Sequence, residues 1–122
     1  MALRILIFFM FFHSFLSQPL FAQYQITDNC IQAWEAIIDL RLVTADSLIK
    51  AELEENPNNY YAYYLSQTCD AYELMINNST KAYEKLIPKY EERMYMMEDN
   101  DVYSPHYLTC IAEMQLQMGM FN

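Results

Sequence analysis

Few side chains in this 122-residue sequence are of types that carry out catalysis. Beyond residue 22 the single histidine is His106, which with Ser104 gives one candidate serine–histidine pair. Such a pair also needs an oxyanion hole and a third, orienting group, and no motif here supplies either. We therefore interpret His106 as a surface residue and expect a protein that is not an enzyme.

The sequence also contains few residues in patterns that bind metal ions or cofactors. Asp99, Asn100 and Asp101 could suggest calcium, but a calcium loop needs more oxygen ligands and a glycine at its turn. The one glycine is Gly119, so phosphate-cradling loops and dinucleotide fingerprints are excluded. A single histidine beyond residue 22 also excludes metal sites that need several histidines. We expect no metal and no cofactor.

The cysteines Cys30, Cys69 and Cys110 are odd in number and contain no CxxC pair. An exported chain could form one disulfide and keep one free thiol. Alternatively, all three are small apolar residues buried in helix contacts, because each lies within an apolar helical stripe. The sequence leaves both interpretations open.

Four basic residues recur at a spacing of four, Lys81, Lys85, Lys89 and Arg93. This spacing places them in a column on one helix face, where like charges destabilise the helix by a few tenths of a kcal/mol per pair. An acidic partner could offset that cost. Acidic neighbours within the fold, such as Asp70 and Glu73, or plain solvation would do the same.

The overall charge restricts the class of partner. Acidic residues outnumber basic ones 16 to 7, and the formal net charge is −9. Such a surface repels nucleic acids and anionic membranes. We therefore expect no nucleic-acid partner.

Residues 1–22 have the order of a secretory signal peptide. Arg4 precedes the apolar run 5–12, and Ala22 is a plausible cleavage point. An uncleaved anchor is the alternative, but polar residues from His13 onward interrupt the run before it reaches about 20 residues. We expect cleavage, export to the periplasm, cell surface or medium, and no stable membrane span afterwards.

The remaining chain, residues 23–122, is dominated by helix formers and apolar residues at intervals of three and four. Asp28 and Thr44 are candidate N-caps, and Ser104-Pro105 is a strong helix start. The apolar period continues across Pro88, which argues for one helix there. The pattern predicts an all-α fold of five helices, at about residues 28–40, 44–55, 59–76, 80–98 and from 105 towards the end.

Part of this pattern follows a helical repeat. With Pro57 at position 32 of a 34-residue unit, Ala33 falls at position 8 and Ala45 at position 20, where small residues are usual. Position 27, usually small, is Glu52. The segment 51–59, the tripeptide Leu86-Ile87-Pro88 and the segment 104–108 resemble the N-terminal part of secreted bacterial tetratricopeptide-repeat proteins. The resemblance implies a right-handed stack of antiparallel hairpins, incomplete at its C-terminus.

The resemblance also implies groove-facing positions, which fall on Tyr61, Tyr64, Thr68 and Tyr72 of the third helix. Trp34 on the first helix is a further candidate. Tyrosine offers an apolar face and a polar tip, which suits peptide or sugar recognition. The alternative is that this stripe is interhelical core, as helical stripes usually are.

We therefore predict a non-catalytic, exported scaffold that binds a protein or peptide. One alternative is a cell-surface protein that captures glycans, which predicts coplanar exposed tyrosines beside carboxylates. Another is a non-functional fragment of a longer scaffold, which predicts a bare apolar face at Ile111, Met114 and Met118. An incomplete stack could also self-associate through the C-terminal helix.

Overall fold

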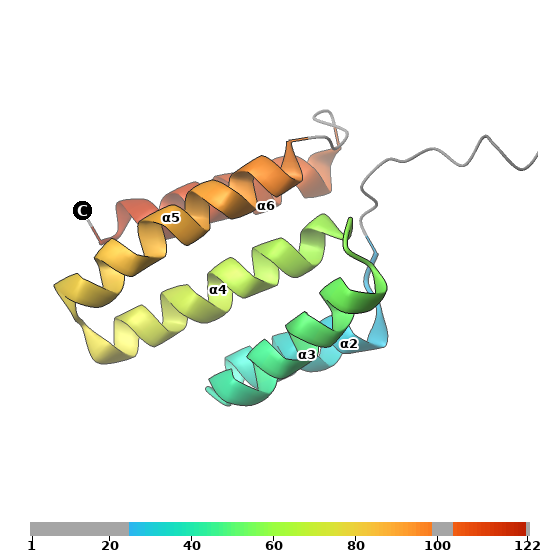
Figure 1. Cartoon of the computed structure of the whole chain (residues 1–122), viewed down its shortest axis with the longest axis horizontal. Helices are drawn as coiled ribbons and strands as arrows, with labels where there is room; N and C mark the ends of the chain where they lie inside the picture. Colours follow the sequence, from blue (N-terminus) through green and yellow to red (C-terminus); the bar gives the residue numbers. More distant parts are fainter. Residues whose placement is uncertain (1–24, 99–103, 122) are drawn as a thin grey trace, which may run out of the picture.

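The computed structural model describes residues 25–98 and 104–121 (Figure 1). The predicted leader and the acidic loop at 99–101 lie outside these residues. The described residues form five helices and no strand, as the apolar periodicity predicts. The helices are α2 (Asp28–Ile38), α3 (Leu42–Glu55), α4 (Tyr60–Asn77), α5 (Thr80–Met97) and α6 (Pro105–Gly119).

The helices are arranged as stacked hairpins, which confirms the predicted all-α class. Helix α2 packs against α3, and α4 packs against α5. Helix α4 is central, because it also contacts α2, α3 and α6. In Figure 1 the α2/α3 pair lies on one side of α4 and the α5/α6 pair lies on the other.

Two helix starts differ from those predicted. The N-cap of α2 is Thr27, not Asp28, because the Thr27 hydroxyl accepts a hydrogen bond from the backbone N–H of Cys30. Helix α3 begins at Leu42 rather than after Thr44, and it has no side-chain cap. The chain turns sharply there, since Leu40 has a left-handed φ of 58° and the Arg41 N–H donates to the Ala36 carbonyl.

Small residues allow α2 and α3 to approach closely. Ala33, Ala36 and Ala45 have no exposed surface, and Ile37 is buried beside them. Ala33 and Ala45 occupy two of the three positions at which the repeat pattern usually has small residues. Side chains without bulk let helix backbones pack at short distance, and this is what the alanines contribute here.

Helix α5 runs without interruption across Pro88, as the apolar period predicts. It is much less buried than α4. Leu86 and Met97 are its buried residues, whereas α4 buries half of its length. Helix α5 therefore presents most of its surface, including its lysines, to solvent.

A buried carboxylate joins the beginning and the end of the first hairpin. Glu52 is 1% exposed. Its Oε2 accepts from the Thr27 hydroxyl at 2.5 Å, and its Oε1 accepts from the amides of Asn56 and Asn59 at 3.0 and 2.8 Å. Burial on its own would raise the pKa of Glu52, but hydrogen bonds from Thr27, Asn59, Asn56 and Asn29 outweigh it and hold the pKa below its ordinary value.

Asn59 extends this network to the chain before α2. Its side-chain oxygen accepts from the Gln25 backbone N–H at 3.2 Å, and its amide donates to the Gln25 carbonyl at 2.9 Å. The same oxygen accepts from the Tyr61 N–H and caps α4. One asparagine thus joins the entry to α2, the end of α3 and the start of α4.

Helix α6 packs most of its apolar stripe inward, although Leu108, which the spacing of apolar residues also predicts to be buried, is 52% exposed. Met114 lies in the main core, and Met118 packs with Leu74 and Leu86 in a second cluster. Ile111 is half-buried against the main core. The bare face at Ile111, Met114 and Met118 that the fragment alternative predicted is therefore covered by α4 and α5.

Candidate functional site

A hollow between α4 and α5 gathers the basic residues of this acidic chain. It encloses about 300 Å³, and its polar lining includes Asp70 and Glu73 from α4 with Lys81, Lys85 and Lys89 from α5. We call this hollow the basic groove. A neighbouring hollow of about 350 Å³ reaches α3 and shares Asp70, Glu73 and Lys89 with it. The second hollow therefore adjoins the basic groove on the side of α3.

The turn between α4 and α5 sets the register of the groove. Helix α4 ends at Asn77, and its C-cap Asn78 has a left-handed φ of 40° and donates its N–H to the Leu74 carbonyl. Ser79 then caps α5 by accepting from the Ala82 N–H at 3.4 Å. Asparagine tolerates the left-handed region better than other residues, and serine is a favoured N-cap. The local sequence thus folds the two helices back on each other.

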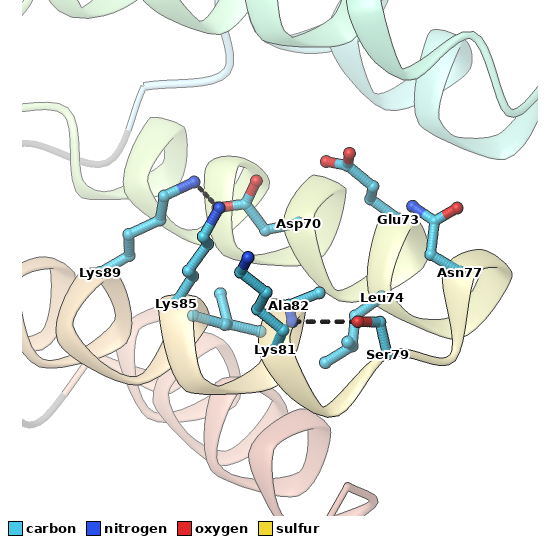
Figure 2. Close-up of a pocket in the computed structure, with 10 residues that line it drawn as sticks. Asp70, Glu73, Leu74, Asn77, Ser79, Lys81, Ala82, Lys85 and Lys89 are labelled. Atoms are coloured by element: carbon cyan, nitrogen blue, oxygen red, sulfur yellow. Dashed lines mark hydrogen bonds and ion pairs between the residues drawn. The ribbon is translucent and has the colours of Figure 1, made fainter.

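The spacing of four places the lysines in one column facing α4. Figure 2 shows Lys81, Lys85 and Lys89 rising from α5 towards α4, which contributes Asp70 and Glu73 to the same lining. Three lysines against two carboxylates leave an excess of one positive charge in this lining. The chain as a whole carries −9, so the groove has the opposite sign to the molecule.

Two residues of the predicted basic column, Lys89 and Arg93, form ion pairs within the fold. Arg93 pairs with Asp70 at 2.5 Å, and its guanidinium also donates to Gln67 at 2.8 Å and to Ser66 at 2.9 Å. Lys89 pairs with the same Asp70 oxygen at 3.3 Å. The acidic neighbour that the sequence offered for the column is therefore Asp70.

Arg93 is only 12% exposed, so its side chain joins α5 to α4 and is not open to a ligand. Its partners Ser66 and Gln67 were missed in the sequence, because nothing in a single helix pattern shows which polar residue faces a neighbouring helix. The one signal available in the sequence is a polar residue, such as Gln67, among the apolar residues of a helix, because such a residue needs a hydrogen-bond partner when it is buried.

The other two residues of the column remain accessible to a ligand. Lys81 and Lys85 are both exposed, and within the described residues neither forms an ion pair. Asp70 already faces two cations, which leaves Glu73 as the other carboxylate of the lining. Two ammonium groups four residues apart in a hollow are suited to bind carboxylates or other anionic groups of a ligand.

Two of the residues predicted to face a groove are buried instead. Tyr64 and Thr68 are buried between α4 and α6, so they do not line an open groove. The Tyr64 hydroxyl donates to the Glu113 carboxylate, and the Gln117 amide donates to the Thr68 hydroxyl at 3.1 Å. Burial and the nearby Glu113 raise the pKa of Tyr64. For these two residues the alternative interpretation, interhelical core, is correct.

The other candidates are partly accessible. Tyr61 and Tyr72 are half-buried and pack on the core, and the Tyr61 ring stacks on Tyr64 with centroids 5.6 Å apart. Trp34 is 37% exposed on the outer face of α2. Among the described tyrosines only Tyr95 is exposed, so the coplanar exposed rings that glycan capture predicted are not formed in this part of the chain.

The three cysteine thiols lie in environments that suppress their reactivity. Cys30, Cys69 and Cys110 are all free and buried. Burial, with smaller contributions from carboxylates, raises the pKa of Cys69 to about 11 and that of Cys110 to about 12. Burial also raises the pKa of Cys30. In the structure the buried-residue interpretation of the cysteines is the one realised.

The described part of the chain contains no group of three His, Cys, Asp or Glu side chains that could hold a metal ion. His106 is exposed in the first turn of α6. None of the helices described is long and apolar enough to cross a membrane. A scan against family models, a search of curated proteins and a search of solved structures each found no match to this chain.

Proposed function

We propose that this chain is a non-catalytic, exported scaffold of helical hairpins that binds an acidic segment of a protein partner in the basic groove. The observation that carries the proposal is the pair Lys81 and Lys85, exposed in a hollow and without ion pairs among the described residues. The sequence suggested a tyrosine-lined groove instead. The burial of Tyr64 and Thr68 moves the proposed site to the α4/α5 side.

The charge balance supports an acidic ligand. The protein carries an excess of carboxylates, so most of its surface repels acidic peptides over several ångströms. The basic groove is an exception, and its lining is held in place by the Arg93–Asp70 pair. Attraction confined to one hollow gives selectivity in where an acidic segment binds.

The length of the groove indicates the size of the ligand. Lys81 and Lys89 are eight residues apart, which is about 12 Å along a helix. An extended peptide covers that distance with about four residues. Leu74 and Leu86 also line the hollow, so a segment with two carboxylates around an apolar side chain would match both kinds of contact.

The test uses labelled peptides of about eight residues, roughly twice the number that covers the span above, in which glutamates flank a leucine, with glutamine-containing peptides as neutral partners. Fluorescence anisotropy at low salt should detect binding of the acidic peptides only. Lys81→Gln and Lys85→Gln should each weaken binding by about threefold to fivefold, the range expected for an exposed charge pair.

Arg41→Gln is the matched control. Arg41 is basic and exposed, but it pairs with Asp39 in the turn between α2 and α3 and does not line the groove. This variant should bind like the original chain. Equal binding of acidic and neutral peptides, no binding of any acidic peptide, or an equal loss in all three variants would contradict the proposal.

A further inference from the structure

Helix α2 exposes an apolar stripe beside its buried face. Ile31, Trp34 and Ile38 are all exposed, and their spacing of three and four places them on one side of the helix. The buried residues of α2 occupy a different side and lie in the main core; they are Cys30, Ala33, Ala36 and Ile37. The stripe is therefore open to solvent and available to a partner.

A column of carboxylates runs beside this stripe. Asp28, Glu35 and Asp39 are exposed, and their spacing of seven and four places them together on the helix surface. Glu35 is four residues after Ile31 and three before Ile38, so the column and the stripe are direct neighbours. Helix α2 contains no lysine or arginine. Its exposed surface is thus apolar along one line and negative along the next.

The carboxylate column is unfavourable for α2 on its own. Glu35 and Asp39 are like charges four residues apart, an arrangement that destabilises a helix. Asp39 is also the C-cap, at the helix end where the dipole favours cations. Arg41 pairs with Asp39 at 3.1 Å, but among the described residues Asp28 and Glu35 form no ion pair. The fold therefore offsets part of the repulsion, and a cationic ligand would offset the rest.

The apolar stripe is suited to a protein contact. Trp34 is the one tryptophan of the chain, and it lies between the two isoleucines of the stripe. Tryptophan contributes strongly to binding when a partner removes its ring from water. Ile31 and Ile38 are seven residues apart, which is about 10 Å along the helix and matches two turns of a second helix.

We propose that this surface binds an amphipathic helix of a partner protein, one in which a column of Lys or Arg lies beside an apolar stripe. We call the surface the acidic α2 face; it consists of Ile31, Trp34, Ile38 and the carboxylates of Asp28, Glu35 and Asp39. The apolar stripe of the partner packs on the apolar residues, as in other contacts of amphipathic helices. Its basic column lies along the carboxylates and sets the orientation of the helix.

Net charge alone does not define this surface. A chain that carries −9 attracts basic ligands over much of its surface, and it repels a second copy of itself. The acidic α2 face differs because apolar and acidic residues lie side by side on one helix. It is also separate from the basic groove, since α2 and α5 lie on opposite sides of α4 (Figure 1).

The test uses the fluorescence of Trp34, which reports on this face because the chain has no other tryptophan. The 122-residue chain is produced in a secreting host, and its N-terminus is read by mass spectrometry. The probe is a tryptophan-free helical peptide of about 14 residues, or four turns, with leucines in one stripe and lysines beside it. The peptide should shift the emission of Trp34 to shorter wavelength, with a dissociation constant of about 10 to 100 µM, as expected for a small contact.

A rearranged peptide is the control for the ligand. It has the same composition, but its leucines are distributed around the helix, so it keeps the charge and loses the stripe. It should bind at least about tenfold more weakly, since the apolar contact supplies much of the binding energy. An equal shift with both peptides would show a general attraction of basic peptides and would overturn the proposal.

Ile38→Lys and Leu116→Lys are matched variants of the protein. Both place a lysine at an exposed helical leucine or isoleucine, 56% exposed in α2 and 66% exposed in α6. Ile38→Lys should weaken binding about tenfold, because it puts a cation within the stripe, and Leu116→Lys should change it little. Glu35→Gln should weaken binding about threefold, as expected for one exposed charge pair.

Three further results would overturn the proposal. One is an equal loss of binding in Ile38→Lys and Leu116→Lys, and another is the absence of any shift with the patterned peptide at about 1 mM, well above the expected constant. The third is a shift in Trp34 emission when the chain alone is concentrated. That result would assign the acidic α2 face to a second copy of the chain.

The two proposed sites can be tested independently. Lys81→Gln should weaken the binding of acidic peptides in the basic groove and leave the binding of the basic helix unchanged. Ile38→Lys should have the opposite selectivity, because Ile38 does not line that groove. Either proposal can therefore fail while the other holds.

Discussion

The two hairpins of this protein are held together by different kinds of interaction. The α2/α3 hairpin combines closely packed alanines with one buried carboxylate, Glu52, that neutral donors surround. The α4/α5 hairpin is linked by a partly exposed ion-pair network around Asp70, while α5 buries little. The comparison shows that the basic groove lies along α5, which has the fewest buried residues of the five described helices, so its side chains remain available to a ligand.

The largest expected effect removes the polar centre of the first hairpin. Glu52→Ala leaves the donors of Thr27, Asn56 and Asn59 without their shared acceptor in a buried site. We expect a loss of about 3 kcal/mol in the free energy of unfolding, measured by urea denaturation. Glu54→Ala, at an exposed position of the same helix, should change it by less than about 0.5 kcal/mol. Similar losses in both variants would contradict the role of Glu52.

The second effect concerns the ion-pair network of α4 and α5. Asp70→Asn removes the carboxylate opposite Arg93 and Lys89, and Arg93 is mostly buried. We expect a loss of about 2 kcal/mol in thermal or urea unfolding, less than for a fully buried pair because Asp70 retains some exposure.

Asp46→Asn is the control for that change. Asp46 pairs with Lys50 at 2.6 Å on the surface of α3, and both side chains are largely exposed. Its loss should cost about 0.3 kcal/mol, as is usual for exposed pairs at this helical spacing. Equal costs for the two aspartates would show that the network around Asp70 is no stronger than a surface ion pair.

The third effect is a pH dependence that belongs to the first hairpin. The folded pKa of Glu52 is lower than its unfolded value near 4.5, so the unfolded chain takes up a proton first as the pH falls. The contribution of Glu52 is complete above that unfolded value and is lost as the pH falls through the folded pKa. Glu52→Gln should remove this part of the acid sensitivity in denaturation curves between pH 6 and pH 2. An unchanged slope would mean that Glu52 is not ionised in the fold.

The smallest effect is a gain in stability at the turn between α2 and α3. Leu40 has a φ of 58° and an exposed side chain, so it bears the cost of the left-handed region without the benefit of burial. Leu40→Gly should stabilise the protein by about 0.5 to 1 kcal/mol in the same denaturation assay. A loss of stability would indicate that the Leu40 side chain contributes packing that outweighs the backbone cost.

The helices could be predicted from the sequence because apolar spacing is a local property. The five predicted segments match the five helices, and continuity across Pro88 was predicted correctly. The start of α3 was predicted wrongly, because a left-handed turn at a leucine has no sequence signal. The signal for export and the likeness to tetratricopeptide repeats remain predictions.

The site was harder to predict, since it depends on which helix faces which. Tyr64 and Thr68 lie on the expected helix face, but α6 covers that face and takes both hydroxyl groups into contacts. The hydrogen-bond network of Glu52 was missed because its donors come from two separate parts of the sequence, Thr27 before α2 and residues 56–59 after α3. The three asparagines that follow an acidic helix end were the one local indication of it.

The positions of the cysteines have a practical consequence. Cys30 lies in α2, Cys69 in α4 and Cys110 in α6, so three helices of the stack each carry one thiol. Because each thiol is buried, an alkylating reagent reaches it only when the local structure opens. The three alkylation rates would thus report separately on the local opening of α2, α4 and α6, without any mutation being introduced.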